Sequence, residues 1–283
     1  MRTMALADGT VLPVIGQGTW RLGERREVRS DEVAALRAGV EAGMTLIDTA
    51  EMYANGGAER VVGEAIRGVP RESLFLVSKV YPHNASRGRI EKSLDDTLSR
   101  MGVDYLDLYL LHWRGGADLE EVVECMEHLK STGKIVRWGV SNFDAEEIDE
   151  LLSLPCGTNC ATNQVLYHVA SRGIEYDLLP LMRRRGVKLM AYSPLAQAGN
   201  LKRGILSHPV LQDVARRHNT TAAAVMLAFA TRGGDTLAIP RTGSASHAVQ
   251  NAQAGDLVLS DEDLAAIDEA FPAPQHKVPL DIS

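Results

Sequence analysis

The chain contains two short apolar runs, Leu74-Phe75-Leu76-Val77-Ser78-Lys79 and Tyr105-Leu106-Asp107-Leu108-Tyr109-Leu110-Leu111-His112. An amphipathic stretch at residues 87–101 separates them. Apolar runs of strand length on either side of a stretch of helix length are typical of a strand–helix–strand unit. A helix of this kind is the usual crossover between parallel neighbours in a sheet. This part of the sequence therefore predicts a parallel sheet covered by helices.

The same alternation extends over the rest of the chain. It predicts strands at residues 14–18, 45–48, 74–79, 105–112, 136–141, 161–164, 188–192 and 236–240. It predicts helices at residues 30–42, 58–67, 87–101, 119–132, 144–152, 176–185, 209–219, 221–232 and 244–254. Eight repeats favour an α/β fold closed into a (β/α)8 TIM barrel over an open doubly wound sheet. Gly16 and Gly18 also lack the third glycine of the dinucleotide-binding fingerprint.

Local signals add detail at the ends of these elements. Extended runs at residues 3–6 and 10–12 flank a turn at residues 8–9 that reads Asp-Gly, which predicts an N-terminal β-hairpin cap. Ser30 stands where a helix should begin, and Gly102 and Gly186 stand where helices should end. The longest expected loop covers residues 193–207, and no linker divides the chain. We expect residues 1–283 to form a single domain.

Composition excludes several classes of protein. The 283 residues are 45% hydrophobic and 24% charged, which is typical of a globular protein. A net charge of −7 argues against a nucleic-acid binder, and no stretch approaches the roughly 20 apolar residues of a membrane span. Cys125, Cys156 and Cys160 lack the spacing of a metal site and are expected to be reduced thiols. We expect a cytoplasmic protein that binds no metal and is a monomer.

Polar residues end three successive predicted strands. They are Asp48, Lys79 and His112, and Tyr53 lies on the loop that follows the first of them. Each strand end alone has an ordinary alternative: a turn cap, an exposed lysine or a buried core histidine. The active site of a barrel lies at the carboxyl ends of its strands, however, so these four residues are expected to converge.

Together these residues suit proton transfer. A tyrosine hydroxyl, with a reference pKa of about 10, needs a nearby cation to favour its phenolate. Lys79 can be that cation, Asp48 can keep Lys79 charged, and His112 can donate a hydrogen bond to a substrate oxygen. Reduction of a carbonyl needs such a proton donor, together with a hydride that only a cofactor can supply.

Eight motifs extend this pattern over nearly the whole chain. They are Gly16-Gln17-Gly18-Thr19-Trp20, Asp48-Thr49-Ala50-Glu51-Met52-Tyr53 followed by Ala58-Glu59, Val77-Ser78-Lys79, the run from Asp104 to Trp113, Gly139-Val140-Ser141-Asn142-Phe143, Asn163-Gln164, Ala191-Tyr192-Ser193-Pro194-Leu195 and Ile239-Pro240-Arg241-Thr242. In type and order they resemble those of the aldo-keto reductase family, in particular its short bacterial members similar to 2,5-diketo-gluconate reductases.

The resemblance implies a catalytic tetrad of Asp48, Tyr53, Lys79 and His112, with Tyr53 as the general acid, and NADPH as the cofactor. It implies that the cofactor is bound by Thr19, Trp20, Ser141, Asn142, Gln164, Tyr192, Ser193, Leu195, Arg241, Thr242, His247 and Asn251. Arg241 and Thr242 would meet the adenosine 2′-phosphate. Arg241 replaces a lysine common in the family, and Gln250 replaces an acid.

The expected substrate pocket is apolar. Its walls are predicted to be Trp20, Met52, Tyr81 and Trp113, although tryptophans in barrel loops also serve simply to pack. The chain after Phe271 is short, whereas longer family members close the pocket with this segment. We therefore expect an open pocket that accepts many aldehydes and ketones as small-molecule substrates.

Three functions follow from these residues. The first is NADPH-dependent reduction of aldehydes and ketones to alcohols. The second is a nicotinamide-binding barrel that acts as a sensor or assembly partner, which the complete tetrad disfavours. The third is a lyase that uses Lys79 to form a Schiff base, and trapping with borohydride would label Lys79 only in that case.

Overall fold

The computed structural model describes residues 1–196 and 204–282. Its main sheet has eight parallel strands in sequential order: β3 (Gln17–Gly18), β4 (Leu46–Asp48), β5 (Phe75–Val80), β6 (Leu106–Leu111), β7 (Ile135–Ser141), β8 (Cys160–Leu166), β9 (Lys188–Tyr192) and β10 (Thr236–Ile239). The Gly16 N–H donates to the Ala238 carbonyl at 2.8 Å, and the Gly18 N–H donates to the Pro240 carbonyl at 3.0 Å. These bonds close the first strand onto the last, so the predicted (β/α)8 barrel is confirmed.

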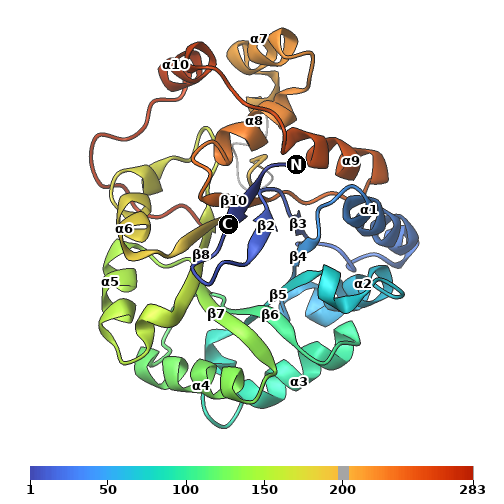
Figure 1. Ribbon diagram of the computed structural model, residues 1–283, viewed down its shortest axis with the longest axis vertical. Helices are drawn as coiled ribbons and strands as arrows, with labels where there is room; N and C mark the ends of the chain where they lie inside the picture. Colours follow the sequence, from blue (N-terminus) through green and yellow to red (C-terminus); the bar gives the residue numbers. More distant parts are fainter. Residues whose placement is uncertain (197–203, 283) are drawn as a thin grey trace.

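Helices surround this sheet in Figure 1. They are α1 (Arg29–Glu41), α2 (Gly57–Ala65), α3 (Ile90–Met101), α4 (Leu119–Ser131), α5 (Ala145–Ser153), α6 (Leu178–Arg185), α7 (Pro209–Arg217), α8 (Ala222–Ala230), α9 (Ala245–Ala254) and α10 (Asp261–Ala270). Gly102 and Gly186 end α3 and α6 in the left-handed conformation, as expected. The role predicted for Ser30 is wrong, because α1 begins at Arg29 and has no side-chain cap.

Helix α10 was not predicted. It lies outside the strand–helix repeat, and Asp263 and Ile267 are its only buried residues, so its apolar periodicity is weak. Its start does carry a sequence signal, because Ser260 and Asp263 form a reciprocal capping box. The Asp263 carboxylate also accepts hydrogen bonds from Arg217, which attaches the helix to α7.

The N-terminal hairpin covers one end of the barrel. Strands β1 (Thr3–Ala5) and β2 (Val11–Pro13) pair antiparallel, as predicted. Their buried side chains include Met4 and Leu12, which line a small apolar cavity together with residues of the barrel strands. Figure 1 shows the hairpin in blue over the middle of the barrel. The opposite end of the barrel, where the strands have their carboxyl termini, is not covered by this hairpin.

The glycines of the first motif serve strand packing at the barrel seam. A Cβ atom on Gly18 would lie 2.7 Å from the carbonyl oxygen of Ile239, and one on Gly16 would lie 2.7 Å from the Leu46 side chain. At Gly18 a larger residue would push the neighbouring backbone away, whereas at Gly16 the Leu46 side chain would have to move. The seam next to the pocket therefore depends on two residues without side chains.

Other expectations from the sequence have mixed outcomes. Much of the predicted loop at 193–207 lies outside the described residues, and the single-domain assignment of residues 1–283 stays a prediction. The three cysteines are unpaired, with Cys125 and Cys160 buried and Cys156 exposed. Within the described ranges, no helix has the length and apolar character needed to span a membrane.

Candidate active site

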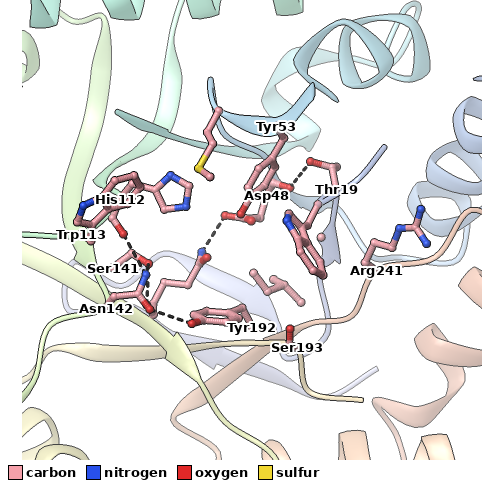
Figure 2. A pocket seen from close by; sticks show the side chains of 15 residues that line it. Thr19, Asp48, Tyr53, His112, Trp113, Ser141, Asn142, Tyr192, Ser193 and Arg241 are labelled. Carbon is pink, nitrogen blue, oxygen red and sulfur yellow. Dashed lines mark hydrogen bonds between the residues drawn. The ribbon is translucent and has the colours of Figure 1, made fainter. Parts of the chain in front are cut away.

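The polar strand ends meet at one point of the barrel mouth. Lys79 in β5 is fully buried, and its Nζ donates to Asp48 Oδ2 at 2.7 Å and to the Thr49 carbonyl at 2.9 Å. Tyr53 begins the 3₁₀ turn η2 (Tyr53–Gly56), and its Oη lies 3.3 Å from Lys79 Nζ. Figure 2 shows Tyr53 directly beside Asp48. The three residues form a continuous chain from a carboxylate through an ammonium to a phenol.

Burial strongly affects the pKa values of these three residues. It raises the pKa of Tyr53, and this effect exceeds the opposing attraction of the Lys79 ammonium. For Lys79, burial lowers the pKa, but the interactions with Asp48 and Tyr53 outweigh it and hold that pKa above its usual range. Burial also raises the pKa of Asp48, against the effect of Lys79. The result at neutral pH is a protonated phenol next to a charged ammonium.

His112, which follows β6, faces the same space as a neutral ring. Burial, together with the Lys79 charge, lowers its pKa to about 3. Its ring lies edge-on to the ring of Tyr53, with centroids 5.7 Å apart. Its Nδ1 atom is buried and has no hydrogen-bond partner among the described residues. A neutral imidazole can donate one N–H to a ligand without adding positive charge.

These groups open into a pocket with an empty volume, mouth included, of about 730 Å³. The apolar side chains that line it include Trp20, Met52 and Trp113. Figure 2 shows Arg241 at the opposite side of the pocket from His112 and Trp113. The remaining lining residues are Gly18, Thr19, Asp48, Ser141, Asn142, Gln164, Tyr192, Ser193 and Ile239. The pocket thus combines three large apolar side chains, the polar residues Ser141, Asn142 and Gln164, and a cation on one side.

The polar lining residues are joined to Asp48 of the tetrad by hydrogen bonds. Gln164 Nε2 donates to Asp48 Oδ1 at 2.8 Å, so both carboxylate oxygens of Asp48 are occupied. The Thr19 hydroxyl donates to the Asp48 carbonyl at 2.9 Å. Ser141 Oγ in turn donates to the Gln164 carbonyl at 2.8 Å. Together with the bond from Lys79, the contacts from Gln164 and Thr19 hold both the side chain and the backbone of Asp48 in place.

A second set of bonds reaches His112. Asn142 Nδ2 donates to the His112 carbonyl at 3.1 Å, and the Tyr192 hydroxyl donates to Asn142 Oδ1 at 2.9 Å. Asn142 and Ser193 adopt left-handed backbone conformations, with φ of 59° and 47°. Such conformations persist in non-glycine residues only where the surroundings enforce them, and they concentrate at functional sites.

Some predicted residues lie outside the pocket lining. Tyr81 packs edge-on against Trp113, with centroids 5.6 Å apart, and supports the wall from behind. Leu195, Thr242, His247 and Asn251 also lie outside the lining; His247 is exposed and Asn251 is buried, both on α9. Conversely, Gly18 and Ile239 line the pocket although the sequence reasoning did not select them. Their positions at the ends of β3 and β10 were the available signal.

The model of the aldo/keto reductase family matches residues 14–271. The methylglyoxal reductase YeaE of Escherichia coli is 54% identical over 271 residues, which are 96% of this chain and 95% of that protein. The chain belongs to the aldo/keto reductase family. The chain is also 32% identical to the glyoxal reductase of Bacillus subtilis, over 94% of this chain and 91% of that protein.

Solved structures of other members have the same architecture as this reductase. An aldo/keto reductase from Klebsiella pneumoniae, crystallised with NADP and acetate, has a TM-score of 0.97 and 50% identity, with both chains fully covered. A putative 2,5-diketo-D-gluconic acid reductase B has a TM-score of 0.84 and 28% identity, over 100% of this chain and 95% of that chain. The family resemblance and the barrel fold inferred from the sequence are therefore both confirmed.

Proposed function

We propose that this protein reduces aldehydes and ketones to alcohols with NADPH, and that Tyr53 is the general acid. The observation that carries the proposal is the buried series Asp48, Lys79 and Tyr53 beside a neutral His112, in a pocket that holds Arg241 on its opposite side. A passive nicotinamide sensor would not need this proton-donating set. A Schiff-base lyase would need an uncharged Lys79, which the ion pair with Asp48 opposes.

The pocket residues fit this cofactor. The Ser141 hydroxyl and the side-chain amides of Asn142 and Gln164 suit a polar carboxamide, and the face of Tyr192 suits a planar ring. The guanidinium of Arg241 suits a phosphate. Two structures of K. pneumoniae homologues, at 50% and 51% identity, contain NADP and NADPH and support the assignment. When bound, NADPH supplies the hydride that no side chain can provide.

The chain itself supplies the proton and the orientation. The Tyr53 hydroxyl donates its proton to the carbonyl oxygen as negative charge develops there. Lys79, 3.3 Å from that hydroxyl, stabilises the phenolate that remains. Asp48 keeps Lys79 charged, and the N–H of neutral His112 orients the carbonyl oxygen toward Tyr53. The apolar residues Trp20, Met52 and Trp113 then receive the rest of the substrate.

The substrate class follows from the relatives and from the pocket. Two relatives are named for methylglyoxal and glyoxal, so we propose that small α-oxoaldehydes are substrates. The tryptophan walls also favour aromatic aldehydes over short aliphatic monoaldehydes. The test is loss of NADPH absorbance with methylglyoxal, benzaldehyde, propanal and a diketone. We expect turnover with several of them and a lower KM for benzaldehyde than for propanal. Absence of turnover with every carbonyl would overturn the proposal.

Arg241 is expected to set the preference for NADPH over NADH. A charge-assisted hydrogen bond contributes about 1.5 to 3 kcal/mol, so Arg241→Ala should raise the KM for NADPH by roughly tenfold to a hundredfold. The KM for NADH should change little, because NADH lacks the 2′-phosphate. Steady-state kinetics with both cofactors measure the difference, and Arg216→Ala on α7 is the control. Equal weakening of both cofactors would show that the phosphate site is elsewhere.

We further infer that the enzyme works in the cytoplasm, as a monomer and as one domain over residues 1–283. The inference rests on the reduced thiols, the negative net charge and the continuous strand–helix repeat. Sedimentation analysis of the purified chain tests the monomer, and a dimeric species at micromolar concentration would contradict it.

A further inference from the structure

Glu51 lies within the Asp48–Tyr53 motif but has no part in the proposed chemistry. Its Oε1 accepts hydrogen bonds from the Tyr81 N–H at 2.7 Å and from Asn84 Nδ2 at 3.1 Å. Its Oε2 accepts one from the hydroxyl of Ser93 on α3. It forms no ion pair within residues 1–196 and 204–282. The carboxylate is therefore held by three uncharged donors, two in the loop after β5 and one on α3.

The backbone around Glu51 explains this arrangement. Pairing with β5 continues past the end of β4, because the Thr49 N–H donates to the Val77 carbonyl and the Glu51 N–H donates to the Lys79 carbonyl. The next donor along that edge is the Tyr81 N–H, which the Glu51 side chain accepts in place of a backbone carbonyl. The carboxylate thus extends the attachment between the two strands after the ladder itself has ended.

This attachment lies next to a strained turn. Directly after Tyr53, residues Ala54, Asn55 and Gly56 are all left-handed, with φ of 50°, 51° and 76°. Two of them have a side chain, so the turn costs free energy that contacts on either side of it must offset. On the C-terminal side, Gly56 continues into α2. On the N-terminal side, Glu51 is the residue whose side chain bonds to the neighbouring loop.

The neighbouring loop supports part of the pocket wall without lining the pocket. Tyr81, whose N–H is bound by Glu51, packs its ring against Trp113, and Asn84 ends the 3₁₀ turn η4 (Pro82–Asn84). One carboxylate therefore connects the loop that carries Tyr53 with the loop that supports Trp113. The pKa of Tyr53 is shifted by burial, Lys79 and Asp48, and not by Glu51. Glu51 can therefore act on Tyr53 only through its position.

We propose that Glu51 is a positioning residue, which holds the Tyr53 hydroxyl at a set distance from the Trp113 wall so that a bound carbonyl meets its proton donor. The proposal rests on the proposed function, in which Tyr53 is the general acid. It makes no use of the residues assigned to cofactor binding, which lie directly after β3 and from β7 onward. Substituting Glu51 should therefore impair turnover without weakening the binding of NADPH.

The test is Glu51→Gln, which keeps the shape but places an NH₂ group among hydrogen-bond donors. Displacement of reacting groups by about 1 Å costs as much as a hundredfold in rate, so we expect kcat with methylglyoxal to fall by roughly tenfold to a hundredfold. This kcat is expressed per NADPH-binding site, and the sites are counted by fluorescence titration. The Kd for NADPH should stay within about twofold of the wild-type value. Glu124→Gln on α4, which loses a surface contact with Arg87, is the control and should behave as wild type.

A second measurement is independent of activity. Hydrogen–deuterium exchange of the amides at residues 80–85 should become faster in Glu51→Gln, because the Tyr81 N–H loses its charged acceptor. Asn84→Ala removes one donor and should cause a smaller loss of turnover than Glu51→Gln.

The proposal requires both effects of Glu51→Gln. Wild-type turnover per site, or wild-type exchange at residues 80–85, would overturn it. A structural role alone would reduce the number of NADPH-binding sites and leave turnover per site unchanged. If the wild type reduces no carbonyl, the proposed function fails by itself, and the exchange rates alone then decide whether Glu51 anchors the loop.

Discussion

Tyr53→Phe should lower kcat for carbonyl reduction by about 10²-fold to 10⁴-fold, which is the usual contribution of a general acid. The phenylalanine ring fills the same space and lacks only the hydroxyl next to Lys79. The Kd for NADPH should remain close to that of wild type, because the variant loses a proton donor rather than a binding group. Single-turnover reduction of methylglyoxal, together with fluorescence titration of NADPH, measures both quantities.

The control for this variant is Tyr176→Phe, which removes an exposed tyrosine hydroxyl outside the pocket lining. It should leave turnover unchanged. If Tyr53→Phe kept most of the wild-type kcat, another group would have to supply the proton. The neutral state of His112 would then make its N–H the first candidate to examine.

Lys79→Met should abolish turnover and also destabilise the protein. The substitution leaves the Asp48 carboxylate buried, at 2% exposure, without its cation. Removing one partner of a buried ion pair costs about 3 to 5 kcal/mol in free energy of unfolding. The phenol would also lose the ammonium that lowers its pKa and stabilises its phenolate. Urea denaturation and steady-state kinetics measure the two effects.

The double variant Asp48→Asn with Lys79→Met separates stability from catalysis. With both charges removed, most of the lost free energy of unfolding should return, while turnover stays absent. Lys92→Met, which breaks an exposed ion pair with Asp96, is the surface control and should change stability by less than about 1 kcal/mol. A single Lys79→Met variant with normal activity would contradict the role proposed for this residue.

The order and type of most elements could be predicted from sequence because buried parallel strands are continuous apolar runs. The runs at 74–79 and 105–112 became β5 and β6 within one or two residues of the expected bounds. Helix α10 was missed because it buries little apolar surface and is attached to α7 by Asp263. A contact of that kind leaves no periodic pattern in the sequence.

The candidate tetrad could also be selected from sequence, because the carboxyl ends of successive barrel strands must converge. Asp48, Lys79 and His112 each end such a strand, and the structure brings them together with Tyr53. The more distant cofactor residues, such as His247 and Asn251, were assigned by resemblance alone. They lie outside the pocket lining, so their assignment to the cofactor stays a prediction.

The sequence by itself determined the barrel and the kinds of side chain at its mouth, since these follow from periodicity and from the order of strand ends. It also indicated the family, through the resemblance of its eight motifs. Only the tertiary structure decided the pKa shifts, because burial that no local pattern reveals raises the pKa of Tyr53 and lowers that of His112, which stays neutral. It alone also showed Gln164 bound to Asp48 and Glu51 bound to Tyr81. Those contacts join residues far apart in the chain, and they exist only once the strands are packed side by side.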